Sequence, residues 1–220
     1  MRRVDVPNFV AVTRDGYDRT AAMYAERFHH HLDDKPVDRA VLAAFAGLLS
    51  TSPNSTVVDV GCGTGATTAL LDGCGLTVSG VDVSPKMIAH ARRLNPDLSF
   101  TVGSMSSLGA ADASVGGIFA WYSIVHIPDE HLAGVFEEFH RVLVPGGFVL
   151  LAFQVGDQPR MLTHAFGHEV NLTFFRRQPN AVSNQLVRAG FDVYAELVRQ
   201  PDDDGFETTP HAYLIARKAL

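Results

Sequence analysis

The stretch Val57-Val58-Asp59-Val60-Gly61-Cys62-Gly63-Thr64-Gly65 decides the fold of this chain. A short run rich in β-branched residues, 56–60, leads into a turn with three glycines, and a helical pattern follows at 66–71. Glycines adopt backbone angles that side chains forbid, and they let a ligand lie against bare backbone. Open α/β sheets bind nucleotides at this kind of junction, beyond the carboxyl end of a parallel strand. The stretch therefore predicts a nucleotide-binding α/β domain.

Two carboxylates near this turn narrow the choice of ligand. Asp82 ends the next predicted strand, 17 positions after Gly65, where a carboxylate can accept hydrogen bonds from both hydroxyls of a ribose. Asp59 stands where dinucleotide dehydrogenases usually carry an apolar residue, and the glycines are spaced G-x-G-x-G rather than G-x-G-x-x-G. A carboxylate repels a pyrophosphate but attracts an ammonium group. The pattern therefore disfavours a nicotinamide-dependent oxidoreductase and favours S-adenosylmethionine, which carries an ammonium and a sulfonium.

Strand and helix patterns alternate from residue 56 to residue 153, which predicts βαβ units and a mostly parallel sheet. In the tail, two strand patterns are joined by an acidic turn at 201–205 with no helix between them, which predicts an antiparallel pair. Helices are expected at 16–32, from Pro36, at 66–71, from Pro85, at 129–143 and at 180–189. Strands are expected at 56–60, 76–83 and 98–102, within 115–125, and at 148–153, 191–199 and 212–217, while residues 1–15 look irregular.

Composition excludes several classes of function. The net charge of −6 and the pI near 5.9 argue against a nucleic-acid partner, because nucleic-acid binders usually carry a basic footprint. No signal-peptide pattern begins the chain, and no stretch reaches the roughly 18 apolar residues of a membrane span. Two cysteines, Cys62 and Cys74, are too few for a disulfide framework. We expect a cytoplasmic monomer or homodimer with a small-molecule substrate and no membrane partner.

Four segments in the expected order give the chain a family resemblance. It resembles the class I, Rossmann-like S-adenosylmethionine-dependent methyltransferases, and more narrowly the small bacterial enzymes that act on small molecules. The matching segments are Asp59-Val60-Gly61-Cys62-Gly63-Thr64-Gly65, Gly80-Val81-Asp82-Val83-Ser84-Pro85-Lys86-Met87, Phe100-Thr101-Val102-Gly103-Ser104-Met105 and Arg141-Val142-Leu143-Val144-Pro145-Gly146-Gly147. The chain departs from many relatives at Gly116-Gly117, where they carry an acidic residue.

The expected fold is thus α/β, a Rossmann-like, doubly wound, mostly parallel seven-stranded sheet with a C-terminal antiparallel strand pair and N-terminal helices. A length of 220 residues suits a single domain. Its expected parts are N-terminal helices forming a cap at 1–55, a cofactor-binding core at 56–153, a lid over the substrate at 154–178, and a C-terminal helix with antiparallel strands at 179–220.

The resemblance implies a set of cofactor contacts for S-adenosylmethionine and its product S-adenosylhomocysteine. The glycines line the methionine part, Asp82 holds the ribose, and a small residue fills the position of Cys62. An N-terminal helix closes over the cofactor in relatives. The residues implied in cofactor binding are Tyr17, Tyr24, Asp59, Gly61, Cys62, Gly63, Gly65, Asp82, Val83, Met87, Gly103, Ser104, Met105, Trp121 and Tyr122.

The candidate catalytic residues are His126 and Tyr122, which follow the fourth predicted strand. A hydroxyl acceptor benefits from a base with a pKa near neutrality, and a histidine beyond that strand suits the task. A carbon or nitrogen acceptor needs only alignment, and His126 is then a loop residue. No metal is expected, because Gly167 interrupts any helix that would bring His164 and His168 together.

Two further points stay open at this level. In the expected lid, Phe153, Phe166, Phe174 and Phe175 suit an apolar acceptor, whereas Arg176 and Arg177 suit an acidic one. Some relatives of this fold bind the cofactor and catalyse cyclisation or other chemistry without methyl transfer. Formation of S-adenosylhomocysteine separates those relatives from a methyltransferase.

Overall fold

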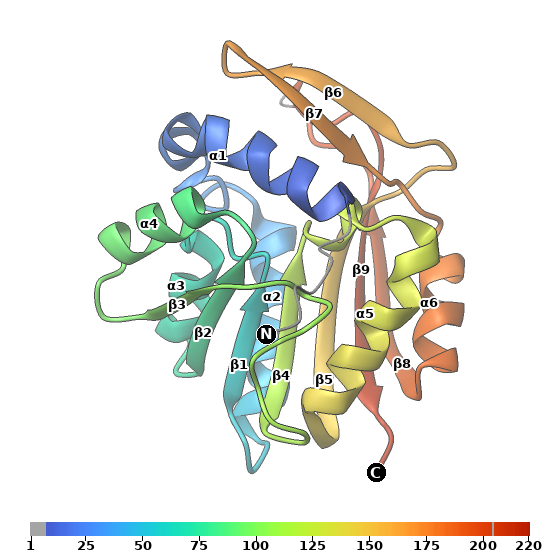
Figure 1. Ribbon diagram of the computed structural model, residues 1–220. Helices are drawn as coiled ribbons and strands as arrows, with labels where there is room; N and C mark the ends of the chain where they lie inside the picture. The colour runs from blue at the N-terminus through green and yellow to red at the C-terminus, as the bar shows by residue number, and fades with distance from the viewer. Residues whose placement is uncertain (1–7, 204) are drawn as a thin grey trace, which may run out of the picture.

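The computed structural model describes residues 8–203 and 205–220, and its elements follow the expected alternation (Figure 1). The helices are α1 (Asn8–Phe28), α2 (Pro36–Ser50), α3 (Ala66–Gly73), α4 (Pro85–Leu94), the short 3₁₀ helix η1 (Ile124–His126), α5 (Asp129–Val142) and α6 (Pro179–Arg188). The strands are β1 (Thr56–Val60), β2 (Thr77–Asp82), β3 (Ser99–Val102), β4 (Val115–Trp121), β5 (Leu143–Gln154), β6 (Arg160–Ala165), β7 (His168–Phe174), β8 (Phe191–Arg199) and β9 (His211–Lys218).

Seven of the strands form one sheet in the order β3-β2-β1-β4-β5-β9-β8. The first five run parallel, and β9 pairs antiparallel with both β5 and β8. The expected fold class is therefore confirmed, including the antiparallel C-terminal pair. The strand order reverses between β1 and β4, and open α/β sheets bind ligands beyond the carboxyl ends of the strands at such a switch point.

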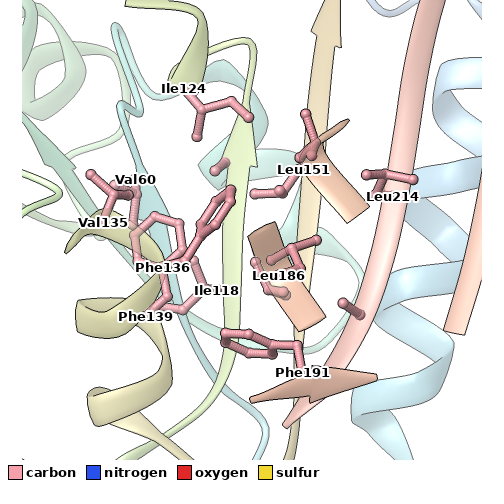
Figure 2. Close-up of a cluster of buried hydrophobic side chains, with 14 of the residues drawn as sticks. Val60, Ile118, Ile124, Val135, Phe136, Phe139, Leu151, Leu186, Phe191 and Leu214 are labelled. Carbon is pink, nitrogen blue, oxygen red and sulfur yellow. The ribbon is translucent and has the colours of Figure 1, made fainter. Parts of the chain in front are cut away.

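Helices cover both faces of this sheet. One apolar cluster joins α5 and α6 to one face, and Figure 2 shows Phe136, Phe139 and Leu186 packed there against sheet residues. A second cluster joins α2 and α3 to the other face through Phe45, Leu49 and Leu71. Each fully buried side chain of this kind contributes about 1.5–3 kcal/mol by leaving water. The two clusters hold the strand ends, and with them the switch point, in fixed positions.

The glycine pair in β4 has a packing reason. A Cβ on Gly116 would lie 1.8 Å from the carbonyl oxygen of Asn54, and a Cβ on Gly117 would lie 2.6 Å from Leu49 Cδ1. The linker before β1 and helix α2 therefore press directly on the β4 backbone. This close approach accounts for the departure from the family pattern at Gly116-Gly117.

Two expected boundaries are wrong, the start of α1 and the start of β5. α1 begins at Asn8, inside the stretch expected to be irregular, because Phe9 packs against the core and its ring lies 4.9 Å from that of His131; residues 1–7 lie outside the described part. The strand expected within 115–125 is β4, which ends at Trp121, since Tyr122 takes a positive φ of 51°. β5 begins at Leu143 and runs through the Pro-Gly-Gly segment that was expected to precede it.

The insertion at 154–178 contains a β-hairpin, β6–β7, that lies over α1 on the side away from the sheet (Figure 1). Its tip is the pair Phe166-Gly167, with φ values of 51° and 78°, which matches the twist of a two-residue hairpin turn. Gly16 of α1 meets Leu172 of β7 so closely that a Cβ on Gly16 would lie 2.7 Å from Leu172 Cδ2. Two layers, α1 and the hairpin, thus cover the carboxyl end of the sheet.

None of the helices in the described part of the chain combines the length and the low polarity that crossing a lipid bilayer requires.

Candidate active site

The glycine turn after β1 lies at the switch point. Gly61, Gly63 and Gly65 all have positive φ, at 75°, 54° and 83°, which explains why glycine occupies each position. A Cβ on Gly61 would lie 2.3 Å from Ser123 Cβ, so the turn after β1 touches the turn after β4. The backbone here is bare and closely packed on one side.

Asp82 joins this turn to the start of α4. Its Oδ2 accepts a hydrogen bond from the Gly63 N–H at 2.9 Å, and its Oδ1 accepts one from the Ser84 N–H at 2.8 Å. Burial raises the pKa of Asp82 to about 6, against the opposing effect of these two hydrogen bonds, and nearby Asp18 raises it further. A carboxylate is thus held at the carboxyl end of β2, where the sequence predicted a ribose partner.

α1 brings two predicted residues, Tyr17 and Tyr24, to the same place. Their rings lie edge to face with centroids 5.9 Å apart, and Tyr24 Cε1 lies 3.7 Å from the position of a Cβ on Gly63. Burial, followed by the charges of Asp82 and Asp59, raises the pKa of Tyr24 to about 12. The two phenols therefore stay neutral above the glycine turn.

Asp18 fastens α1 to this end of the sheet. Its Oδ1 accepts hydrogen bonds from Ser84 Oγ at 2.6 Å and from the Lys86 N–H at 3.0 Å. Ser84 also caps α4 by accepting the Met87 N–H, as its position before Pro85 predicted. The Asp18 carboxylate of α1 thus lies at the positive N-terminal end of α4.

Asp59 is fully buried in β1 and only half satisfied. Thr67 and Thr68 of α3 donate hydrogen bonds to its Oδ2 at 2.9 and 2.6 Å, whereas Oδ1 has no partner in the described part of the chain. Burial raises the pKa of Asp59 to about 6, although the threonine hydroxyls lower it. A buried carboxylate oxygen without a partner is costly, and a cationic ligand would remove that cost.

His126 lies in η1 and links three elements. Its Nδ1 lies 2.9 Å from the Thr173 carbonyl of β7, and its Nε2 lies 2.7 Å from the Tyr17 hydroxyl of α1. Because a carbonyl only accepts, Nδ1 carries the proton, and the Tyr17 hydroxyl donates to Nε2. Burial lowers the pKa of His126 to about 4, so the ring is neutral at physiological pH.

Tyr122 is bound on the other side of the site, toward β9. Its hydroxyl lies 2.5 Å from His211 Nδ1 and 3.2 Å from the Tyr213 hydroxyl. Tyr213 in turn donates to Asp38 of α2 at 2.8 Å, and Arg199 of β8 donates to Asp38 at 3.1 Å. The Tyr122 hydroxyl is therefore engaged by a network that runs to α2 and β8, and the structure does not bring it to His126.

The other predicted cofactor residues lie around the same strand ends or beneath them. Met87 and Cys62 are buried, the Gly103 N–H donates to the Asp82 carbonyl at 2.9 Å, and Ser104 Oγ lies 2.9 Å from Ser106 Oγ. Trp121 lies in the core cluster beside α2, stacked on Phe119 with centroids 5.3 Å apart. Cofactor contacts of these residues, of Val83 and of Met105 stay predictions.

The sequence analysis missed several residues at this site. Asp18 binds Ser84, Ser123 packs against Gly61, and His211 binds Tyr122. The two members of each pair are 62 to 89 positions apart in the sequence. Adjacency to Tyr17 and to Tyr122 was the only local signal for Asp18 and Ser123. Within residues 8–203 and 205–220, no group of three or more histidine, cysteine, aspartate or glutamate side chains is arranged to hold a metal ion.

Comparison of the sequence with known proteins assigns the chain to a family. The profile of the family described as "Methyltransferase domain" matches residues 57–147. A demethylmenaquinone methyltransferase from Beutenbergia cavernae is 32% identical over 176 residues, covering 80% of this chain and 71% of that protein. The chain belongs to the S-adenosylmethionine-dependent methyltransferases, and its cofactor is S-adenosylmethionine.

Further relatives agree in fold and family. The 2-methyl-6-phytyl-1,4-hydroquinone methyltransferase of Synechocystis sp. is 32% identical over 115 residues, which cover 50% of this chain but only 36% of that protein. The solved structure of DhpI with S-adenosylhomocysteine superposes with a TM-score of 0.72 at 21% identity, over 97% of this chain and 98% of that one. At this identity the structural likeness concerns the fold.

The residues at the switch point fit this cofactor. Asp82 lies where a carboxylate can accept hydrogen bonds from ribose hydroxyls, and its Oδ2 is bound to the turn of three glycines with positive φ. The unpartnered Oδ1 of Asp59 suits a cation, which the ammonium group supplies. The set of groups matches the charge and the hydroxyls of S-adenosylmethionine.

Proposed function

We propose that this protein transfers a methyl group from S-adenosylmethionine to a small-molecule acceptor in bacterial specialised metabolism. The observation that carries the proposal is the closure of α1 over the glycine turn, with Tyr24 at Gly63 and Asp18 bound at the start of α4. Such closure supports a dry site, which methyl transfer from a sulfonium requires for alignment and for exclusion of water.

The chain's own residues have separate tasks in this proposal. S-adenosylmethionine supplies the methyl group as an electrophile when it is bound. Asp82 holds the ribose hydroxyls, and Asp59 holds the ammonium group. Tyr17 and His126 position the acceptor: the Tyr17 hydroxyl donates to His126 Nε2, and its oxygen can accept a hydrogen bond from the acceptor hydroxyl. Burial lowers the pKa of His126 to about 4, which disfavours the general-base role that the sequence predicted, so the neutral imidazole acts by orienting Tyr17. The acceptor oxygen takes the methyl group, and its proton leaves to water.

The acceptor we propose is a hydroxylated aromatic ring. The names of two relatives state that they methylate a hydroquinone and a demethylmenaquinone, and both names point to oxygen-bearing rings. In this chain, Phe28 of α1 lies 6.3 Å from Phe166 at the hairpin tip and 5.6 Å from Phe206 between β8 and β9, measured between ring centroids. This aromatic cluster at the C-terminal end of α1 supplies apolar surface that suits contact with a flat apolar ligand.

A turnover experiment tests the function. The purified protein is incubated with S-adenosylmethionine and a panel of phenols and hydroquinones, and S-adenosylhomocysteine and methylated products are measured by mass spectrometry. Asp82→Ala serves as the matched control, and we expect its S-adenosylhomocysteine affinity to fall about tenfold or more, since charge-assisted hydrogen bonds contribute about 1.5–3 kcal/mol each. Conversion of an acceptor without formation of S-adenosylhomocysteine would favour the cyclisation alternative and contradict methyl transfer.

A further inference from the structure

Two adjacent arginines that follow β7 have opposite environments. Arg177 is buried, and its guanidinium donates to Asp129 at 2.8 Å and to the carbonyls of Ile124, Phe175 and Ile127. All three nitrogens of the guanidinium donate hydrogen bonds, and these bonds hold η1 and the start of α5 in place. Arg177 is therefore a structural residue, and its neighbour Arg176 remains as a candidate for binding a ligand.

Arg176 has far fewer partners. Its Nη2 donates to Thr208 Oγ1 at 3.1 Å, whereas its Nε is buried and has no hydrogen-bond partner in the described part of the chain. No carboxylate forms an ion pair with Arg176 among residues 8–203 and 205–220. Burial, followed by the like charge of Arg160, lowers the pKa of Arg176. The guanidinium thus carries a charge that the surrounding protein does not neutralise.

Arg176 lies at the same end of the sheet as the candidate active site. Its Cδ lies 3.1 Å from the position of a Cβ on Gly156, two residues beyond the end of β5. The register pairs Gln154, the last residue of β5, with His211, and His211 binds the Tyr122 hydroxyl. The side-chain oxygen Oε1 of Gln154 is also buried without a partner in the described residues. The Arg176 Nε–H and the Gln154 Oε1 atom, both without hydrogen-bond partners in the described residues, therefore lie beside the strand ends. The molecule that receives the methyl group has to bind at these strand ends.

We propose that Arg176 binds an oxyanion of the acceptor molecule, a carboxylate or a phosphate-type group, at the carboxyl end of β5. The inference rests on the proposed function, because it takes the acceptor site to lie at these strand ends. A planar guanidinium presents parallel N–H groups that match two oxygens of one anion. With Nη2 on Thr208 and Nε buried, Nη1 makes no hydrogen bond within the described residues and is the donor available to the ligand. The substrate then combines an aromatic ring with an acidic group. The apolar acceptor and the acidic acceptor, which the sequence left as alternatives, are then one molecule.

The test uses the ¹⁵N-labelled protein saturated with S-adenosylhomocysteine. Inorganic phosphate and acetate are titrated separately, with chloride holding the ionic strength constant, and the side-chain Nε–H signals of arginine are followed by NMR. The signal that disappears in Arg176→Gln identifies Arg176. We expect this signal to shift in a saturable manner, and we expect Arg176→Gln to weaken anion binding about tenfold or more. Arg188→Gln, on the exposed side of α6, is the matched control and should leave the titration unchanged.

The outcomes separate the two anions and the two proposals. Saturation with phosphate supports a phosphate-type group, and saturation with acetate supports a carboxylate. If neither anion saturates, or if Arg176→Gln binds as tightly as the original protein, the oxyanion site is refuted. Calorimetry of S-adenosylhomocysteine binding is measured first on the same sample. A protein that does not bind S-adenosylhomocysteine refutes the proposed function, whatever the anion titration shows.

Discussion

Asp59 and His126 are buried side chains that burial drives toward their neutral forms, with pKa values of about 6 and about 4. Neither residue has an ion-pair partner of opposite charge in the described part of the chain, so the protein itself does not offset the cost of charging them. A cationic ligand would stabilise the charged form of Asp59, whereas the hydrogen bond from Tyr17 stabilises the neutral form of His126. The two pKa shifts therefore lead to different tests.

Asp59→Asn should change the pH dependence of stability. Because the pKa of Asp59 is raised in the folded state, from 3.8 to about 6, the folded protein binds the proton more tightly than the unfolded chain. The original protein therefore loses stability as the pH rises through this window, and the variant does not. The free energy of unfolding of the variant relative to the original should rise by on the order of 2–3 kcal/mol between pH 4 and pH 7. Denaturant titrations at several pH values measure it, and a constant difference would contradict the assignment.

His126 should titrate far below the usual histidine range. Its pKa is lowered to about 4 by burial, so the folded state resists the proton that the unfolded chain accepts near pH 6.5. Stability from this group is lost as the pH falls from about 6.5 toward 4. NMR of the imidazole protons should give a midpoint near 4. Tyr17→Phe removes the hydroxyl on Nε2 and should raise the midpoint; a midpoint near 6.5 in the original protein would contradict the buried geometry.

At the level of the elements, α1 is fixed at both surfaces it touches. Asp18 binds the start of α4 beneath it, and Arg19 donates to the Glu169 carbonyl of β7 above it at 3.0 Å. Gly16 gives β7 the space for Leu172. Opening the site therefore requires α1 and the hairpin to move together or to separate from each other.

Asp18→Ala should loosen α1 without unfolding the sheet. The substitution removes hydrogen bonds from Ser84 Oγ and the Lys86 N–H, and losing such an interaction at a helix start costs about 0.5–2 kcal/mol. Hydrogen exchange of the amides of α1 should become faster, while β1 and β4 stay protected. Asp15→Ala is the matched control, because Asp15 is exposed on the same helix. Equal exchange in both variants would show that Asp18 does not hold α1.

Gly16→Ala and Gly47→Ala form a second matched pair. Both glycines lie inside helices, where alanine alone would stabilise by about 0.5–1 kcal/mol. A Cβ on Gly47 meets nothing within 4 Å, whereas a Cβ on Gly16 would lie 2.7 Å from Leu172 Cδ2. We expect Gly47→Ala to raise the melting temperature and Gly16→Ala to lower it and to expose the amides of β6–β7 to exchange. A stabilising Gly16→Ala would contradict the contact between α1 and the hairpin.

Local sequence patterns predicted the helices and strands of the core but not the two strands of the β6–β7 hairpin. Ser84-Pro85 predicted the start of α4, and the β-branched run at 56–60 predicted β1, because caps and strand propensities act within a few residues. β6 has mostly exposed side chains and lacks the alternation that identifies a strand. β7 does alternate, with Val170 and Leu172 buried between exposed Glu169 and Asn171, and the sequence analysis overlooked this local signal. The contact of the hairpin with α1, through Leu172 and Gly16, is the part that no local pattern records.

The whole molecule is held together by contacts between distant parts of the sequence. Tyr17 reaches His126 across 109 positions, and Tyr213 reaches Asp38 across 175. The family resemblance implied Tyr17 and Asp82, and the position after the fourth predicted strand suggested His126, yet the bond between Tyr17 and His126 follows only from the folded chain. For the same reason the sequence named Tyr122 beside His126, whereas the fold joins its hydroxyl to β9.

S-adenosylhomocysteine should stabilise the molecule through Asp82 and independently of Arg199. At a hundredfold excess over its dissociation constant, a ligand adds about 2.7 kcal/mol, which raises the melting temperature by about 5–11 °C at this chain length. Arg199→Met removes the cation between Asp38 and Glu207 and should itself lower the melting temperature, since breaking a buried pair costs about 3–5 kcal/mol. The ligand should still raise that lower value by a similar amount, because distant sites act additively, whereas Asp82→Ala should lose most of the rise. Differential scanning fluorimetry on the three proteins measures both effects. A rise that disappears in Arg199→Met would mean that the network behind Tyr122 helps to bind the cofactor.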